Sequence, residues 1–138
     1  MSSSWDRLHW RNWLVRAVLY EVGRTGRPVV PARFRGDVNV EFGDFGGFLV
    51  EVQLRWYRAF DARMDAVLEH EPDDLPAAVA DVWAGLADTM PATRLLLDAH
   101  AEHPALGALH EHHRTSLRSA TGVHRPPGRN DDRYRPAG

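Results

Sequence analysis

Histidines near the end of the chain are the residues whose type and spacing come closest to a recognisable chemistry. His100 and His103 lie three residues apart, and so do His110 and His113. This spacing brings two imidazoles onto one face of a helix, as a metal site requires, and four such ligands suit zinc, nickel or iron. Pro104 separates the two pairs, however, and the run HEHHR equally suits a solvated helix face. The sequence leaves a histidine-ligated metal site as one hypothesis beside an ordinary polar surface.

Large aromatic residues at helical spacing offer a second candidate site. They could line a pocket for a small apolar ligand between helices. They could equally form the core, which a domain of this size needs, and the core is the favoured alternative. The residues are Trp13, Phe45, Phe48, Trp56, Phe60 and Trp83.

Catalytic patterns are missing from the sequence. It contains no glycine-rich phosphate loop after a strand, no G-x-S-x-G and no H-E-x-x-H. The absence of cysteine excludes disulfides, thiolate metal sites and a cysteine nucleophile. These absences favour a protein that is not an enzyme, although they leave an enzyme possible, and the sequence predicts no cofactor.

Charge is unevenly distributed, although the net charge is only −2. Residues 1–35 hold seven arginines and two acids, whereas residues 36–111 hold four arginines and fifteen acids. A basic end could bind nucleic acid, or it could fold back on the acidic middle, which is the favoured alternative. The candidate phosphate contacts are Arg24, Arg27, Arg33 and Arg35.

Hydrophobic periodicity predicts a mainly helical fold, a bundle of about five helices. Apolar residues at spacings of three and four predict a first helix over about 5–22, with Gly23 as its left-handed cap. A long central helix follows over about 44–70, with Asp44 as its cap. Further helices are expected to begin at Asp74, at Pro91 and at His103–Pro104.

Residues 29–42 are the exception, because their apolar residues alternate. One polar residue separates Ala32 from Phe34, and one separates each neighbouring pair of Val38, Val40 and Phe42. This pattern predicts an inserted β-hairpin over about 29–42 with a three-residue loop at 36–38. Such a hairpin would lay its apolar face on the helices and serve as a cover or a pairing edge.

The chain is expected to form one helical domain over residues 1–120, followed by a disordered tail at 121–138 that is rich in Pro, Gly and charge. No apolar run approaches the length of a membrane span, and the start lacks the features of a secretory signal. We therefore expect a cytoplasmic protein without a membrane partner.

The segment EFGDFGGFLVEVQLRWYRAFDARMDAVLE, residues 41–69, resembles the part of TetR-type transcriptional regulators where the DNA-binding head leads into the ligand-binding helices. Residues 91–114, PATRLLLDAHAEHPALGALHEHHR, are similar to their C-terminal helices. The resemblance implies a helical scaffold that binds a small ligand and forms homodimers. It departs from the family over residues 25–41, which leave room for barely one of the two helices that complete such a head. Asp37 and Glu41 there would oppose phosphate.

The leading hypothesis is therefore a non-enzymatic binding or regulatory protein that dimerises through amphipathic helices and has a degenerate DNA-binding head. A functional DNA-binding regulator with a shortened head and a histidine-ligated metal-binding protein are the alternatives.

Overall fold

A computed structural model describes residues 3–121, and these residues are almost entirely helical. In chain order the elements are α1 (Ser3–Thr25), α2 (Ala32–Phe42), α3 (Phe45–Glu69), α4 (Leu75–Thr89), α5 (Pro91–Ala99), the 3-10 turn η1 (Pro104–Leu106) and α6 (Gly107–Thr121). The mainly helical fold expected from the sequence is confirmed. The disordered tail expected at 121–138 lies outside the described residues, apart from Thr121 at the end of α6.

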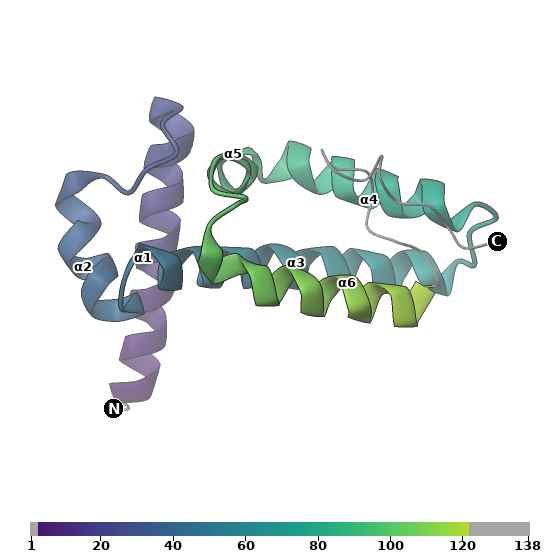
Figure 1. The fold of residues 1–138 in the computed structure, drawn as a ribbon, viewed down its shortest axis with the longest axis horizontal. Coiled ribbons are helices and arrows are strands. Elements are labelled where there is room, and N and C mark those ends of the chain that lie inside the picture. The colour runs from purple at the N-terminus through teal and green to yellow at the C-terminus, as the bar shows by residue number, and fades with distance from the viewer. Residues whose placement is uncertain (1–2, 122–138) are drawn as a thin grey trace.

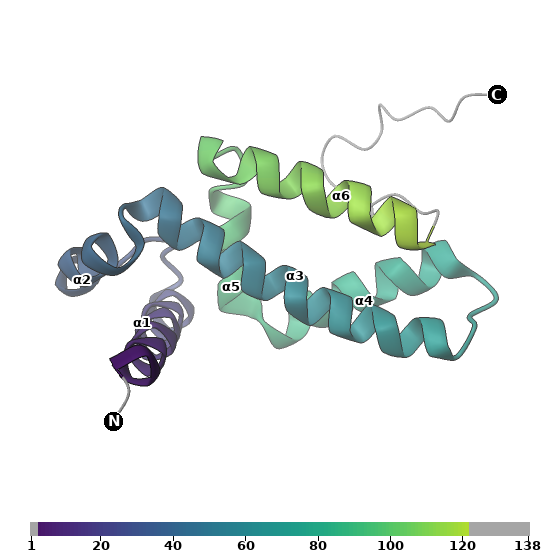
Figure 2. The same cartoon turned by 90° about the horizontal axis from the view of Figure 1, so that it is seen from below.

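The long helix α3 connects two ends of the molecule. α4 and α6 run along α3, while α1 and α2 lie side by side across its N-terminal end (Figures 1 and 2). α1 contacts both α2 and α5, and α2 contacts α3. The α1–α2 pair therefore projects from one end of an elongated helical bundle.

The predicted hairpin over 29–42 is wrong, because residues 32–42 form the helix α2 and residues 3–121 contain no strand. The same apolar residues also fit a helical pattern. Phe34, Val38 and Phe42 recur at intervals of four, which is also the spacing of one helix face. Pro31 occupies the N-cap with φ −56°, and Gly43 ends the helix with φ +88°. The segment is thus bounded by residues that start and stop a helix.

The other predicted helix starts are confirmed, the one at Pro91 by the start of α5 without a side-chain cap and the remaining three with a cap. The Asp44 carboxylate accepts a hydrogen bond from the Gly47 amide at 2.7 Å, and Asp74 accepts one from Ala77 at 3.0 Å. The His103 ring accepts one from the Ala105 amide at 3.1 Å. Each cap satisfies an amide that the first helical turn leaves unpaired.

The first helix ends later than predicted. It continues through Gly23 to Thr25, and Gly26 adopts the left-handed φ of +69° while its amide bonds to the Val22 carbonyl. Gly23 instead marks close packing, since a Cβ built there would lie 3.4 Å from the Ala92 side chain on α5.

The core follows the inner face of α3 and the sides of α1, α4 and α5 that meet it. Removing such side chains from water supplies the main favourable term for folding. Fully buried members include Leu14, Val18, Phe48, Val52, Trp56, Phe60, Val79 and Leu96. Over residues 3–121 no helix combines the length and apolarity that crossing a membrane demands.

Candidate functional site

The helix α2 presents two different faces. Its inner face packs Phe34 against Trp13 of α1 and Phe42 against Phe48 of α3, with ring centroids 6.0 and 5.4 Å apart, and Val38 is buried. The outer face is solvent-exposed and carries no aromatic side chain. It consists of Ala32, Arg35, Gly36, Asn39 and Val40, and we call it the α2 outer face.

Glu41 belongs to the inner side of α2, where two arginines neutralise it. Arg11 donates to its carboxylate at 2.9 Å, and Arg7 lies 3.6 Å from it. Only 6% of the Glu41 side-chain surface is exposed to solvent. Arg11 also reaches Glu51 on α3 at 3.1 Å, so one arginine joins α1, α2 and α3. The expectation that Glu41 faces a phosphate does not fit this geometry.

A second ion cluster lies where α1 and α2 approach each other at the other end of the pair. Arg24 donates hydrogen bonds to the Glu21 carboxylate, the shortest of 2.7 Å, and Arg33 lies 3.1 Å from it. These bonds, from Arg24 first and Arg33 second, lower the pKa of Glu21 from its ordinary 4.5 to about 2. Two of the four arginines predicted as phosphate contacts therefore have a structural role.

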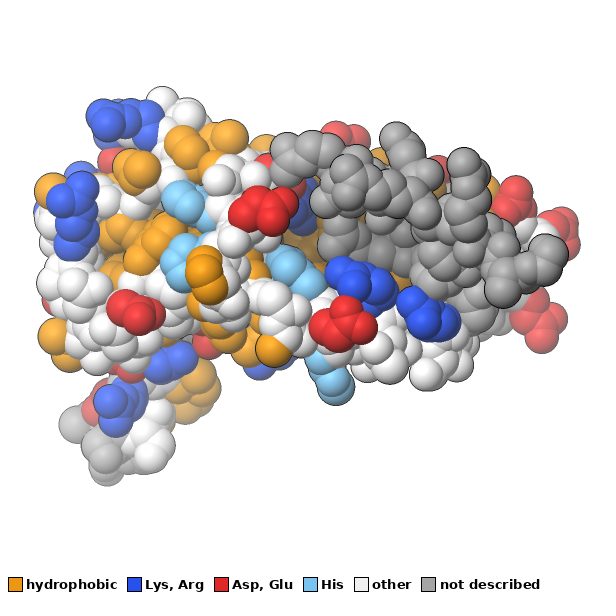
Figure 3. Space-filling view, in the orientation of Figure 1, with side chains coloured by type: hydrophobic (Ala, Val, Ile, Leu, Met, Phe, Trp, Pro, Cys, Tyr) orange, Lys and Arg blue, Asp and Glu red, His pale blue; other side chains and the backbone are white. Residues whose placement is uncertain are grey.

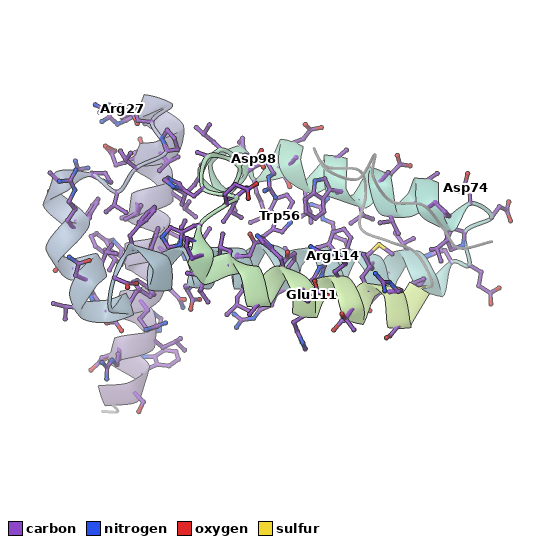
Figure 4. The ribbon with its side chains drawn as sticks, viewed as in Figure 1. Arg27, Trp56, Asp74, Asp98, Glu111 and Arg114 are labelled. Atoms are coloured by element: carbon purple, nitrogen blue, oxygen red, sulfur yellow. The ribbon has the colours of Figure 1, made fainter. Side chains whose placement is uncertain are left out.

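The other two predicted phosphate contacts are available. Arg27 points away from the protein just beyond α1 (Figure 4), and Arg35 lies on the α2 outer face. Within residues 3–121 neither guanidinium has an ion pair or hydrogen bond. The structure brings all four arginines to the same end of the molecule, and in Figure 3 arginine side chains gather over this end.

Charge separates along the molecule. Residues 3–42, which hold α1 and α2, contain seven arginines and four acids, whereas residues 43–121 contain six arginines and thirteen acids. The acidic side chains visible in Figure 3 gather mainly at the far end of α3 and α4. An anionic partner would meet the least repulsion at the α1–α2 end.

Five of the six predicted pocket aromatics lie in the bundle interior. Phe48, Trp56 and Phe60 have no exposed surface, and Phe45 and Trp83 pack partly buried against them. Trp13 is the exception, because 51% of it is exposed on α1. An open depression of about 420 Å³ does lie between α3 and α4, but it is lined by none of the six; its residues are Arg63, Ala66, Val67, Ala78, Asp81 and Val82.

The four histidines occupy separate positions. His100 and His103 lie beside Phe45 near the start of α3, whereas His110 and His113 lie against Tyr57. Twelve residues of α3 separate those two positions, about 18 Å of helix.

Each imidazole is also engaged locally, by the Pro28 carbonyl, the Ala105 amide, the Tyr57 hydroxyl and the Asp61 carboxylate respectively. Among the described residues no group of three or more His, Cys, Asp or Glu side chains is arranged to hold a metal ion.

Sequence reasoning missed an arginine in the bundle. The Arg94 guanidinium stacks over the rings of Trp56 and Trp83, at 4.6 and 5.2 Å from their centroids, and pairs with Asp98 at 2.7 Å. Figure 4 shows Trp56 inside the bundle and Asp98 on α5. The spacing of Arg94 and Asp98, four apart on one helix, was the signal available in the sequence.

Comparison with family models, with curated proteins and with solved structures finds no match for this chain. The resemblance of residues 41–69 and 91–114 to TetR-type regulators therefore rests on its sequence motifs alone.

Proposed function

We propose that this protein is a small, non-enzymatic regulatory protein that binds duplex DNA, with α2 as the helix that enters the major groove. The observation that carries the proposal is the α2 outer face. It offers Arg35 and Asn39, one turn apart, beside Gly36 and Val40. Arginine and asparagine are the side chains that pair with guanine and adenine edges, and apolar groups contact the thymine methyl.

The dimensions of α2 fit this role. Eleven residues of helix are about 16 Å long, and the major groove admits a helix of this kind. Gly36 and Ala32 are small enough for close approach of the backbone. Arg33 and Arg35 fall in the first turn, the positive end of the helix dipole, where DNA-reading helices make their contacts.

The charge pattern supports the same orientation. Arg24 and Arg27 precede α2 and Arg33 lies in its first turn. These three arginines would meet the phosphate backbone, which supplies most of the affinity of such contacts. The acidic bundle of α3–α6 would point away from DNA. In this proposal α1 and α2 together form a shortened head, and the protein shares a cytoplasmic compartment with DNA.

The test is fluorescence anisotropy of a labelled mixed-sequence duplex, long enough for two half-sites, at low salt. We expect binding that weakens steeply as salt rises. Replacing both Arg35 and Asn39 by Ala should reduce affinity at least about tenfold, or 1.4 kcal/mol. Arg58→Ala, an exposed arginine on α3, is the matched control and should change little.

Absence of binding by the folded wild-type protein at low salt would contradict the proposal. A helical scaffold with a degenerate head would then be the better description, and the search would turn to small apolar ligands.

A further inference from the structure

The helix α1 has one side that the rest of the described chain leaves uncovered. Figure 2 shows α1 at the edge of the molecule, with the rest of the described chain on one side of it, where α2 and α5 contact it. Within residues 4–120, seven of the eight most exposed large hydrophobic residues fall in 5–40, and five of these are on α1. An exposed apolar patch of this kind marks an interaction surface.

The uncovered side carries a regular stripe. Its members alternate at spacings of four and three, which is the pattern of a coiled-coil seam. Trp10, Trp13 and Tyr20 are 41, 51 and 69% exposed, and only Ala17 is half-buried. The α1 stripe consists of Asp6, Trp10, Trp13, Ala17, Tyr20 and Arg24.

This α1 stripe is complementary to itself when reversed. In two antiparallel copies of α1 whose two-fold axis passes through the stripe at the level of position 15, Asp6 would lie opposite Arg24 of the second copy. In the same register Trp10 meets Tyr20, and Trp13 meets Ala17. Each pair of facing residues therefore joins either opposite charges, two aromatic rings, or a large side chain and a small one. Such a self-complementary patch is what a two-fold dimer interface requires.

The ion pairs within one copy support this register. The Glu21 carboxylate forms ion pairs with Arg24 at 2.7 Å and with Arg33 at 3.1 Å. Because one carboxylate faces two guanidinium groups, positive charge remains in excess there. Arg24 stays 58% exposed. At the other end of the stripe Asp6 is exposed and has no ion pair within residues 3–121. An antiparallel partner brings this acid to that excess of positive charge.

We infer that α1 is a homodimerisation site at which a second copy of this chain packs antiparallel along the α1 stripe. A contact between two single helices buries less than the about 1,600 Å² of a standard interface, so we expect a dissociation constant in the micromolar range. The inference does not depend on DNA binding, although a two-fold pair would also present two α2 helices to two half-sites.

The first test is sedimentation equilibrium over a concentration series, without DNA. We expect a monomer–dimer equilibrium for the wild-type protein. Tyr20→Glu should weaken it at least about tenfold, because the new carboxylate would be buried against Trp10 of the second copy. Leu8→Glu is the matched control, since Leu8 is 52% exposed on the same helix but lies off the stripe, and it should leave the equilibrium unchanged. Circular dichroism checks that both variants fold.

The second test fixes the register by cross-linking. The chain has no cysteine, so Asp6→Cys and Arg24→Cys each introduce a single thiol. A short bifunctional thiol reagent should link the two variants when they are mixed, and should link neither variant to itself. In the proposed register the two Asp6 positions of a dimer are about 27 Å apart. In the mixed dimer the two introduced thiols face each other at one end of the stripe, and the native Asp6 and Arg24 still pair at the other end.

A wild-type protein that remains monomeric to high micromolar concentration would overturn the inference. So would equal loss of dimer in the Leu8 and Tyr20 variants. Self-linking of Asp6→Cys would indicate a parallel pair and would overturn the antiparallel register. DNA binding is measured separately by anisotropy, and its outcome is independent of the outcome of the dimerisation tests.

Discussion

Arg11 of α1 donates a hydrogen bond to the Glu41 carboxylate at 2.9 Å, and the same guanidinium nitrogen lies 3.2 Å from the Glu41 carbonyl oxygen. This contact fixes the C-terminal end of α2 against α1. It also turns the Glu41 carboxylate away from solvent, with 6% of the side chain exposed. The outer face of α2 consequently carries Arg35 and Asn39 without that acid beside them.

Replacing Arg11 by Met should destabilise the fold. The substitution would leave the nearly buried Glu41 with Arg7 at 3.6 Å and would also remove a partner from Glu51. Loss of hydrogen bonds to buried charged groups costs about 2 kcal/mol. Urea unfolding at neutral pH measures the change. Arg58→Met, at an exposed site on α3, should change the unfolding free energy by less than about 0.5 kcal/mol, and equal effects of the two variants would contradict the role given to Arg11.

The Glu21 cluster predicts how stability changes in acid. The pKa of Glu21 is about 2 in the folded protein, because Arg24 and then Arg33 hydrogen-bond to it, against an ordinary 4.5. Between these values the unfolded chain binds a proton at this site that the folded protein does not. The contribution of Glu21 to stability is therefore complete above pH 4.5 and is lost as the pH falls toward 2.

Glu21→Gln isolates that contribution. The stability difference between wild type and variant, from urea unfolding at several pH values, should shrink as the pH falls from about 5 to 2. Asp98→Asn is a useful control, because Asp98 pairs with Arg94 from a largely exposed position on α5. A difference between the wild type and Glu21→Gln that stays constant over this range would contradict the lowered pKa.

Most helix boundaries could be predicted from the sequence because they are set locally. Asp44 and Asp74 each accept a hydrogen bond from an amide three residues ahead, and capping residues of this type are readable from the chain alone. The error at residues 32–42 has a different origin. Phe34 and Phe42 fit an alternating and a helical pattern equally well, and the decision depends on Trp13 and Phe48, which are distant in sequence.

Gly36 provides a direct check on α2. It lies inside the helix, and a Cβ built there would meet no atom within 4 Å. Alanine should therefore stabilise the protein by about 0.5–1 kcal/mol through its better helix propensity. Thermal or urea unfolding of Gly36→Ala gives the answer. Destabilisation would contradict a helical conformation at this residue.

Asp37 predicts a gain in DNA affinity. It is the remaining exposed acid on α2, and a carboxylate near phosphate opposes binding. Asp37→Asn should therefore tighten duplex binding several-fold at low salt, and the gain should diminish as salt screens the charge. Asp81→Asn, an exposed acid on α4, should have little effect. A weaker Asp37→Asn complex would place α2 away from the duplex.

The candidate site was only partly readable from the sequence. Arg27 and Arg35 are exposed, as expected of residues that could contact an anion. The pairing of Arg24 and Arg33 with Glu21 could not be predicted, because it requires α1 and α2 to be adjacent. Asn39 was not selected, because in a hairpin it would have been one polar residue among several. In the helix α2, Asn39 lies one turn from Arg35, which makes it a candidate base contact in the proposed DNA complex.

The measurement that tests the central proposal most directly is amide chemical-shift mapping of the labelled full chain on addition of a mixed-sequence duplex at low salt. We predict the largest changes at Arg35, Gly36, Asn39 and Val40 on α2, smaller ones around Arg24 and Arg27, and none along α4. Changes confined to α3–α6, or no change on a duplex added in excess, would contradict DNA binding by α2.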